Sequence, residues 1–337
     1  MSYSRREYKK RQQRRRKGFK KWAVRGGIAL FVFLLVLGVG FGYMWQQFEE
    51  VTSGAQQELD RGDRSDMREE AVNPSQDSIS ILFLGVDDRT GNLRGRTDAI
   101  VLATFNAEDQ SVKMLNIPRD SLVNIPGRGQ DKINHAHAFG GIDLAIETVE
   151  DVLDIPVDYF MTLNFMAFME VVDELGGVEV DSPFEISEMD SYDNPGAIWI
   201  PEGEQTLNGE EALAYVRHRQ GDPQGDIGRG ERQKEVLESL IRESASLSSI
   251  TSFGSVMESL ENHMKTNLTF NNIVSLHGYA RNFDEITSLS LDGHGLRTNR
   301  WYYQLDEESL NETSHRLRIH LGLEDEAGRN VMLEDEE

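Results

Sequence analysis

Apolar and polar residues alternate along this chain with several different spacings, and each spacing predicts a different kind of element. Residues 26–48 (GGIALFVFLLVLGVGFGYMWQQF) contain no charged side chain. An α-helix of that length crosses a hydrocarbon layer of about 30 Å. Trp22 precedes this apolar run, and Tyr43 and Trp45 lie near its end. Aromatic residues at both ends are typical of a membrane–water interface, so the pattern predicts one transmembrane helix.

The charges before the apolar run set the predicted orientation of the chain. Residues 1–25 contain twelve Lys or Arg and a single acidic residue, Glu7. By the positive-inside rule, this basic segment is cytoplasmic and the remaining chain lies outside the membrane. A cleavable signal peptide is the competing interpretation, but the run is long and has no small-x-small exit. Nucleic-acid binding by the basic segment is the less favoured alternative.

Residues 49–77 are polar and charged without steady periodicity, which predicts a juxtamembrane stalk. From residue 78 onward, short apolar runs typical of strands cover 78–85, 98–106, 111–118, 158–164, 178–180 and 286–291. Helical spacing of apolar residues covers 142–153, 165–175, 210–217, 229–247, 252–264, 271–282 and 307–321. Interleaved strands and helices predict an α/β sandwich in one domain, residues 78–323. The acidic tail at 324–337 is predicted to be disordered.

The amino-acid composition argues against several classes of function. The formal net charge is −23 although residues 1–25 are basic, so the rest of the chain is strongly acidic. Such a body repels phosphate backbones, and we expect no nucleic-acid partner. Cysteine is absent, which excludes a disulfide framework and a thiolate site.

Two carboxylates next to predicted strands form a candidate metal site. Asp87 ends one strand and Asp98 begins the next, so a tight connection would bring them together. Mg²⁺ is commonly held by one or two carboxylates with phosphate oxygens and water. The alternative is a polar loop with local Asp–Arg pairs. His135 and His137 suggest a zinc pair, but no third ligand has convincing spacing, and ordinary hydrogen-bonded histidines are favoured.

Arginines are concentrated in YVRHRQGDPQGDIGRGERQ, which contains Arg217, Arg219, Arg229 and Arg232. Two cations about 5 Å apart repel by roughly 3 kcal/mol at an effective dielectric constant of 20. An exposed salt bridge returns only about 0–1 kcal/mol. Clustered arginines therefore contribute little to stability. They are well suited to binding phosphate, because each planar guanidinium can contact two phosphate oxygens at once. Ion pairing with neighbouring carboxylates remains the alternative.

Several stretches occur in an order that resembles the LytR–CpsA–Psr family of bacterial cell-wall glycopolymer ligases. They are LFLGVDDR, GRTDAIVLATFN, MLNIPRDSLVNIPG, KINHAHAFGG, IPVDYFMTLNF, VVDELGGVEVD, LNGEEALAYVRHR and DIGRGERQ. The resemblance is dense over residues 79–247 and looser beyond. It implies an α/β domain with a mixed β-sheet sandwiched between helices, preceded by one N-terminal transmembrane helix.

The resemblance also implies a reaction and a set of site residues. Family members move a glycopolymer, teichoic-acid-like or capsular, from a polyprenyl-pyrophosphate carrier to a muramic acid hydroxyl of peptidoglycan, forming a phosphodiester. By motif position, Asp87 and Asp98 would bind Mg²⁺ and, with Arg119, would be catalytic. The residues expected around the pyrophosphate are Arg89, Arg96, Arg119, Lys132, Arg217, Arg219, Arg229 and Gln233.

The lipid chain is expected in an apolar pocket between the sheet and its helices. Candidates for that wall are Phe165, Met166, Phe168, Met169, Val172 and Leu175, with ordinary helix-to-sheet packing as the alternative. Asp88 and His137 depart from the family pattern, so the choice between Asp87 and Asp88 as metal ligand stays open. The implied location is the cell membrane of a Gram-positive-type bacterium, with the catalytic domain extracellular. A polyprenyl-pyrophosphate hydrolase and a non-enzymatic lipid-binding regulator are the rival functions.

Overall fold

The computed structural model describes residues 55–88, 93–219, 221–244, 263–276, 279 and 286–324. The chain divides into two compact units, Met1–Glu50 and Val51–Glu337, and every described residue belongs to the second. The membrane span predicted at residues 26–48 therefore lies outside the described residues. Within those residues, no helix has the length and apolar character needed to cross a bilayer.

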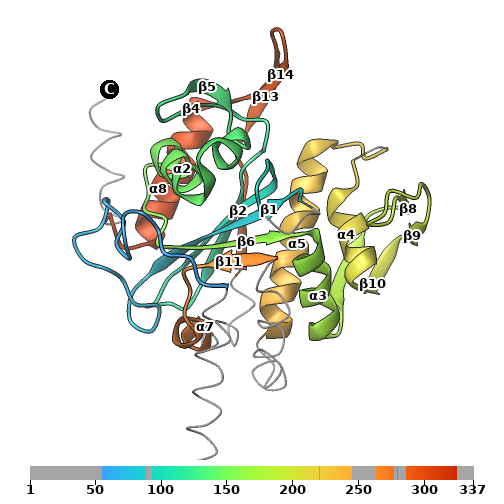
Figure 1. The fold of residues 1–337 in the computed structure, drawn as a ribbon, viewed down its shortest axis with the longest axis horizontal. Helices are drawn as coiled ribbons and strands as arrows, with labels where there is room; N and C mark the ends of the chain where they lie inside the picture. Colours follow the sequence, from blue (N-terminus) through green and yellow to red (C-terminus); the bar gives the residue numbers. More distant parts are fainter. Residues whose placement is uncertain are drawn as a thin grey trace, which may run out of the picture. The chain divides into compact units, whose positions relative to one another are not determined.

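A six-stranded sheet forms the centre of the described unit (Figure 1). The strands are β1 Ile79–Val86, β2 Thr97–Phe105, β3 Val112–Asn116, β6 Tyr159–Asn164, β11 Met264–Thr266 and β12 Ile286–Leu289. Their order in the sheet is β11-β6-β1-β2-β3-β12. β1 pairs with β6, and β3 with β12, in parallel, whereas the other neighbours are antiparallel. The sheet is mixed, as predicted.

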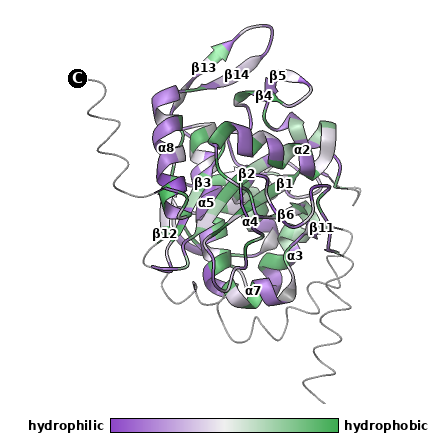
Figure 2. Cartoon of the chain, turned by 90° about the vertical axis from the view of Figure 1, so that its left-hand side faces the viewer, coloured by the Kyte–Doolittle hydropathy of each residue, from purple (hydrophilic) through white to green (hydrophobic). Residues whose placement is uncertain are grey.

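Side chains that alternate along the strands supply two separate cores. The helices that cover the faces are α2 His135–Leu153, α5 Asp226–Ser244, α7 Phe270–Leu276 and α8 Glu307–His320. On β1, Leu82 and Leu84 pack with α2 and α8, whereas Ile81 and Phe83 pack with α5 and α7. Figure 2 shows the apolar colour concentrated in the strands and the polar colour on the outer side of α8. Helices thus pack on both faces of the sheet, which confirms the predicted sandwich. They can do so because alternate residues of each strand point to opposite faces and both sets are apolar.

A smaller lobe lies beside the sheet (Figure 1). It consists of α3 Phe165–Leu175, α4 Gly209–Arg217, β7 Val178–Ser182, β8 Ile186–Glu188, β9 Ile198–Ile200 and β10 Gly203–Leu207. Its core contains Val172, Tyr215 and Val236, the last from α5, so the lobe is joined to the helix layer of the sheet. A Cβ on Gly209 would collide with the backbone of Met169, so only glycine lets α4 approach α3 this closely.

The ends of the lobe's helices follow the signals in the sequence. The side chain of Asn164 accepts a hydrogen bond from the backbone of Ala167 and starts α3, and Gly176, at φ 91°, ends it. Asn208 and Glu211 form a reciprocal capping box at the start of α4. These caps fix where each helix stops, and therefore which residues reach the sheet.

Two hairpins lie at the upper end of the unit in Figure 1. They are β4 Leu122–Ile125 with β5 Gly129–Lys132, and β13 Gly293–Arg297 with β14 Trp301–Leu305. The backbone N–H of Tyr303 donates to the carbonyl of Asp120 at 2.9 Å, which joins the two hairpins. Sequence patterns did not predict these four strands, because each is only four or five residues long.

Other boundaries differ from the predictions. The segment predicted as a stalk at 49–77 is described from residue 55 onward, and it packs against the domain rather than standing free. Arg68 contacts both carboxylate oxygens of Asp158, at 3.0 and 2.8 Å, and Arg61 lies 2.6 Å from Glu150. The sequence of this segment could not reveal these partners, since Glu150 and Asp158 lie about 90 residues further along the chain. Residues 252–262 of one predicted helix lie outside the described residues, as do residues 325–337 of the predicted tail.

Candidate functional site

A cavity of about 570 Å³ lies between the sheet edge, α3, α4 and α5. We call it the amphipathic cavity, because one end is apolar and the other is charged. It is lined by Phe83, Leu84, Gly85, Asp98, Ala99, Val101, Arg119, Leu163, Asn164, Phe165, Phe168, Ser187, Glu188, Met189, Pro195, Gly196, Leu213, Val216, Arg217, Arg219, Arg229, Gln233, Val236, Leu237 and Leu240. Its volume is within the usual range for a site that encloses a small molecule.

The apolar end is built from several elements rather than from one helix. Phe83 comes from β1, Phe165 and Phe168 from α3, and Leu237 and Leu240 from α5. These side chains are only partly buried by the rest of the protein, so an apolar ligand here would remove further apolar surface from water.

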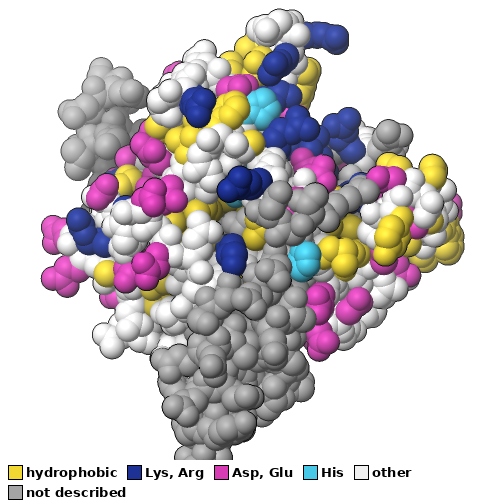
Figure 3. Space-filling view, in the orientation of Figure 1, with side chains coloured by type: hydrophobic (Ala, Val, Ile, Leu, Met, Phe, Trp, Pro, Cys, Tyr) yellow, Lys and Arg dark blue, Asp and Glu magenta, His cyan; other side chains and the backbone are white. Residues whose placement is uncertain are grey.

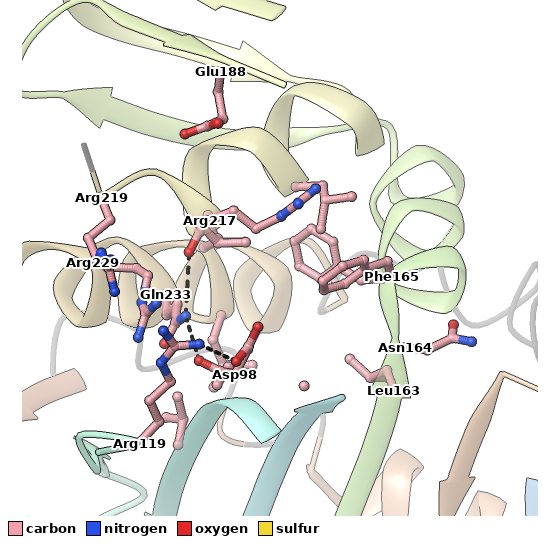
Figure 4. A pocket seen from close by; sticks show the side chains of 18 of the residues that line it. Asp98, Arg119, Leu163, Asn164, Phe165, Glu188, Arg217, Arg219, Arg229 and Gln233 are labelled. Atoms are coloured by element: carbon pink, nitrogen blue, oxygen red, sulfur yellow. Dashed lines mark hydrogen bonds and ion pairs between the residues drawn. The ribbon is translucent and has the colours of Figure 1, made fainter. Parts of the chain in front are cut away.

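The charged end gathers residues that are far apart in the sequence. Figure 4 shows Arg119, Arg219 and Arg229 directed toward one region, next to Asp98 and Gln233. A guanidinium nitrogen of Arg119 pairs with the carboxylate of Asp98. Nε2 of Gln233 lies 3.4 Å from the backbone oxygen of Asp98. The arrangement offers several N–H donors to one anion.

A β-bulge aims Asp98 at this end of the cavity. Gly85 pairs with Ala99 and Val86 pairs with Thr97, so Asp98 is the extra residue on β2. Bulges of this kind redirect a side chain and are common beside functional sites. A Cβ on Gly85 would lie 3.1 Å from the Cβ of Ala99, so glycine keeps the strands close at this point.

Arg229 reaches the same place because α5 approaches β3 closely. A Cβ on the next residue, Gly230, would collide with the side-chain amide of Asn116 near the end of β3. Arg119 lies three residues after the end of β3. The glycine thus lets the first turn of α5 lie against the strand end from which Arg119 projects, although the two arginines are 110 positions apart in the sequence.

The arginine cluster divides into two groups with different surroundings. Arg217 reaches across the apolar end, with its guanidinium carbon 4.9 Å from the centre of the Phe165 ring, and its Nη1 is buried without a hydrogen-bond partner among the described residues. Arg232 points elsewhere. It lies 2.6 Å from Asp222 and donates to the backbone oxygens of Tyr215 and His218. Local ion pairing therefore accounts for Arg232. The other three arginines of the cluster line the amphipathic cavity, where Arg217 also lies 3.7 Å from a carboxylate oxygen of Asp193.

A second cavity, of about 810 Å³, adjoins the charged end. We call it the cationic cavity. It is lined by Arg96, Arg119, Asp120, Lys132, Asn134, His135, Arg219, Gly225, Arg300 and Trp301. Arg119 and Arg219 line both cavities, so the two meet at these side chains. Figure 3 shows the corresponding concentration of dark-blue side chains below the β13–β14 hairpin. Five cationic side chains against one carboxylate make this region strongly positive in an otherwise acidic protein.

Most of the residues predicted for an anion site are therefore brought to these two cavities. Arg217, Arg229 and Gln233 line the amphipathic cavity, Arg96 and Lys132 line the cationic cavity, and Arg119 and Arg219 line both. Arg89 lies outside the described residues. The interactions of these residues with a ligand stay predictions.

The two aspartates at the end of β1 have different environments. Asp88 is buried and its Oδ2 accepts a hydrogen bond from the backbone of Leu93 at 2.9 Å, so it holds the following loop. Asp87 is exposed, and its N–H lies 3.3 Å from the carbonyl of Arg96, which places its backbone beside the start of β2. Asp87 thus follows the last residue of β1, and Asp98 lies on the neighbouring strand, β2.

That pair of carboxylates fits the donor chemistry of Mg²⁺, which accepts one or two carboxylates when phosphate oxygens and water complete its shell. Among the described residues, no group of three His, Asp or Glu side chains forms a complete protein-only metal site. An ion here would therefore depend on a phosphate ligand.

The two histidines considered for zinc have ordinary partners. Nδ1 of His135 lies 2.9 Å from a carboxylate oxygen of Asp131, and Nδ1 of His137 lies 3.0 Å from the carbonyl of Gly95. Burial lowers the pKa of His137, and the contact with Gly95 acts in the opposite direction.

The six residues predicted for a lipid wall lie on α3, and they do not all face the cavity. Of the six residues of α3, Phe165 and Phe168 line the amphipathic cavity, and the other four do not. Met166 is exposed to 48%, and Val172 lies in the core of the lobe. A helix presents only one face to a cavity, so six closely spaced residues cannot all line it.

The structure adds cavity residues that the sequence reasoning missed. Leu213 and Val216 of α4, and Val236, Leu237 and Leu240 of α5, supply the opposite wall. The apolar spacing of α5 was visible in the sequence, but nothing in that spacing distinguishes a residue that faces a cavity from one that faces a filled core. Trp301 and Arg300 of the cationic cavity gave no motif signal either.

Comparison with known proteins defines the class to which this fold and site belong. A family model described as the LytR_cpsA_psr family matches residues 42–319. The chain therefore belongs to the LytR–CpsA–Psr family, and the predicted resemblance is confirmed.

Particular members of the family are similar over most of their length. The polyisoprenyl-teichoic acid–peptidoglycan teichoic acid transferase TagT of Bacillus subtilis (strain 168) is 39% identical over 322 residues, which cover 93% of this chain and 99% of TagT. TagU of the same organism is 40% identical over 296 residues, covering 86% of this chain and 94% of TagU.

Solved structures of TagT share the fold. TagT bound to LIIa-WTA superposes with a TM-score of 0.70 at 41% identity, covering 79% of this chain and 99% of that one. TagT with bound octaprenyl pyrophosphate lipid superposes with a TM-score of 0.66 at 39% identity and the same coverage. The mixed sheet with helices on its faces is thus the fold of this family.

Proposed function

We propose that this protein is a membrane-anchored phosphotransferase that moves an anionic glycopolymer from a polyprenyl-pyrophosphate carrier to a muramic acid hydroxyl of peptidoglycan. The observation that carries the proposal is one cavity with two chemistries. Its apolar end suits a prenyl chain, and its charged end presents Arg119, Arg219 and Arg229 to a diphosphate. Relatives named as teichoic acid transferases, and a TagT structure that holds octaprenyl pyrophosphate, support the same assignment.

The proposed step is a single displacement at phosphorus. The acceptor hydroxyl oxygen forms a bond to the phosphorus that carries the glycopolymer, while the bond from that phosphorus to the bridging oxygen breaks. The hydroxyl loses its proton and polyprenyl phosphate leaves with the electron pair. Guanidinium groups stabilise the negative charge on both phosphoryl groups, and fixed donors of this kind are effective because they need no reorganisation during the reaction.

Asp98 has two contributions in this scheme. Its carboxylate pairs with Arg119 and holds that guanidinium toward the cavity. With Asp87, which follows β1, it also fits an Mg²⁺ ion bound together with the diphosphate. When bound, the ion would neutralise charge on the phosphate oxygens. Removal of divalent ions with a chelator should then stop transfer, and Mg²⁺ should restore it.

The N-terminal part of the chain completes the proposal. The uncharged run at residues 26–48 is proposed to anchor the protein in the cell membrane, with the basic segment 1–25 in the cytoplasm and the folded domain outside. An enzymatic reporter that works only outside the cytoplasm, fused after Glu337, should be active. Activity of a cytoplasm-only reporter at the same position would reverse the assigned topology.

Transfer itself is tested with a radiolabelled lipid-linked donor, with and without soluble peptidoglycan oligomers. We expect label to appear on peptidoglycan with the wild-type chain and to be lost in Arg119→Ala. Release of labelled glycopolymer without attachment would instead favour a polyprenyl-pyrophosphate hydrolase. Full biological activity of Arg119→Ala with intact lipid binding would favour a non-enzymatic regulator.

A further inference from the structure

The cationic cavity contains a wall that the proposed lipid and diphosphate contacts do not use. That wall is formed by Asn134, Arg300 and Trp301, and Lys132, which also lines the cavity, lies near Trp301. Trp301 is the one large apolar side chain of this cavity among the described residues, so the cavity is unsuited to a prenyl chain. A polar, anionic ligand with some flat apolar surface fits its composition.

The position of the wall relates it to the reacting phosphate. Arg119 and Arg219 line both cavities, so a ligand that fills the cationic cavity ends at the same guanidiniums that face the diphosphate. The backbone of Tyr303 bonds to Asp120, the residue after Arg119, at 2.9 Å, and Ser121 forms a β-bridge with Tyr303. The hairpin that presents Trp301 is therefore fixed to the segment that carries Arg119.

The indole ring of Trp301 packs against the facing strand and remains partly exposed to solvent. The side chain is exposed to 42%, and a Cβ on Gly295 of the facing strand would lie 3.1 Å from its Nε1. Lys132 Nζ lies 6.0 Å from the centre of the Trp301 ring and bonds to Asp120 at 2.7 Å. Aromatic rings combine an apolar face with a polar edge, and a sugar ring has the complementary combination of C–H face and hydroxyl edge.

Asn134 supplies an independent indication of a ligand. Only 4% of this residue is exposed, it lines the cationic cavity, and its side-chain oxygen has no hydrogen-bond partner among the described residues. A buried polar atom without a partner costs about 1–3 kcal/mol, so such atoms in native proteins require a reason. A ligand rich in hydroxyl groups would provide the missing partner in either orientation of the amide.

We propose that the cationic cavity is a subsite for an anionic saccharide, in which Trp301 stacks on a sugar ring, Asn134 bonds a hydroxyl group, and Arg300 and Lys132 attract phosphate or carboxylate groups. The inference rests on the proposed transfer, because the saccharide is taken as one of its two substrates. The same chemistry belongs to the sugars of the donor glycopolymer and to the glycan of the peptidoglycan acceptor.

The test compares Trp301→Ala with Trp199→Ala in the full-length chain in detergent. Trp199 is exposed to 57% on β9 and lines neither cavity, which makes it a matched control for the loss of a surface indole. Loss of one stacking ring typically weakens binding by about 1–3 kcal/mol, so Trp301→Ala should raise KM for a saccharide substrate about tenfold or more. kcat at saturation should change little, and Trp199→Ala should match the wild type.

Separate titrations identify the saccharide. A raised KM for soluble peptidoglycan oligomers alone assigns the acceptor, and a raised KM for the glycopolymer donor alone assigns the donor sugars. Unchanged KM values for both substrates would overturn the proposal. So would an equal loss of affinity for octaprenyl pyrophosphate without sugars, since the wall would then belong to the diphosphate site. Calorimetric titration with the peptidoglycan oligomer alone, and with lipid-free glycopolymer alone, measures binding without transfer. Weaker binding to Trp301→Ala than to the wild type would therefore support the subsite even if the proposed transfer reaction were wrong.

A second pair of variants covers the charge. Arg300→Ala should weaken binding of a phosphate-bearing saccharide and reduce its dependence on salt concentration, because one cation of the cavity is lost. Arg297→Ala removes the same charge from the same hairpin but from a residue that does not line the cavity. Equal effects of the two substitutions would contradict the assignment, and thermal unfolding of each variant excludes a loss of fold as the cause.

Discussion

Arg229 and Arg232 lie about one turn apart on α5, and both are nearly buried, at 7% and 3% exposure. Arg232 is bound on the inner side by Asp222 and by two backbone oxygens, so its charge is neutralised within the protein. Arg229 lies in the wall of the amphipathic cavity with Arg119 and Arg219. The same residue type at nearly the same depth therefore pairs within the protein in one position and lines a cavity in the other.

The difference teaches how to interpret a charge cluster. Burial alone does not distinguish the two arginines, whereas the direction of the guanidinium and the partner it meets do. Burial acts to raise the pKa of Asp222, but the hydrogen bonds from Arg232 and from the backbone of Gln224 outweigh it and keep the net pKa below its usual value. The ion pair thus stabilises the fold above about pH 4, and this contribution is lost as the pH falls through the lowered pKa.

The largest expected effect is on the structural side of the comparison. Arg232→Ala should reduce the free energy of unfolding by about 3–5 kcal/mol, because it leaves a buried carboxylate without its partner. Denaturant unfolding of the full-length chain in detergent measures this loss. Arg242→Ala, which removes an exposed i,i+4 pair with Glu238 on the same helix, should cost no more than about 1 kcal/mol. Similar losses in both variants would remove the distinction.

The second prediction concerns Arg229, the arginine that lines the amphipathic cavity, in the variant Arg229→Ala. Transfer should fall about 100- to 1000-fold, the usual result of losing one fixed donor to a charged transition state. The unfolding free energy should fall less than in Arg232→Ala. Initial rates with labelled donor give the first quantity, and Arg242→Ala should retain the wild-type rate. A normal rate in Arg229→Ala would place the reacting diphosphate elsewhere.

His320 extends the comparison to a buried titratable group that lines neither the amphipathic nor the cationic cavity. Its ring nitrogens lie 2.8 Å from the hydroxyl of Thr104 and 2.7 Å from that of Ser111. Burial, reinforced by Lys113 and opposed by Asp109, lowers the pKa of His320 to about 4. Above about pH 6.5 the histidine is neutral in both states and contributes nothing to the pH dependence of stability. Between pH 6.5 and 4 only the unfolded chain takes up the proton, so acid destabilises the fold by about 3 kcal/mol at pH 4.

The measurement for His320 is the unfolding free energy at several pH values. His320→Gln should show a shallower decline than the wild type between pH 6.5 and 4, whatever its stability at pH 7. His294→Gln, at an exposed histidine of the β13–β14 hairpin, should keep the wild-type slope. Identical slopes in all three proteins would show that His320 is not the group responsible.

The smallest effect concerns the two sides of α3. Phe168 lines the amphipathic cavity, whereas Met166, two residues earlier, is exposed to 48% and does not. Phe168→Ala should raise KM for a long-chain prenyl donor about tenfold, equivalent to about 1–2 kcal/mol of lost apolar contact. Met166→Ala should leave KM unchanged. If a donor with a very short prenyl chain is affected as strongly as the long one, Phe168 acts on something other than the lipid.

Much of the fold was predictable because its signals are local. The period-two runs of β1, β2 and β3, the helical spacing of α2 and α8, and the caps at Asn164 and Asn208 depend on neighbours within a few residues. The hairpins near the cationic cavity were not predicted, because their strands are only four or five residues long. The docking of residues 55–77 was missed for a different reason, since its ion pairs join distant segments.

For the candidate site, the sequence predicted which kinds of residue would take part better than it predicted how their side chains are arranged. The order of the motifs identified the family and the residues that carry charge. It did not show that Arg232 turns inward, that Asp88 holds a loop, or that a bulge aims Asp98 at Arg119. Each of these depends on which atoms lie next to a side chain after folding.

The sequence by itself determined the family, the alternation of strands and helices, and an excess of arginine in an acidic chain. Only the tertiary structure decided which arginines share a cavity, and that one end of the cavity is apolar while the other is charged. The physical reason is that hydrogen bonds and ion pairs act over a few ångströms. The close approach of α5 to β3 at Gly230 joins Arg229 to Arg119 across 110 positions, and no local pattern encodes such a contact.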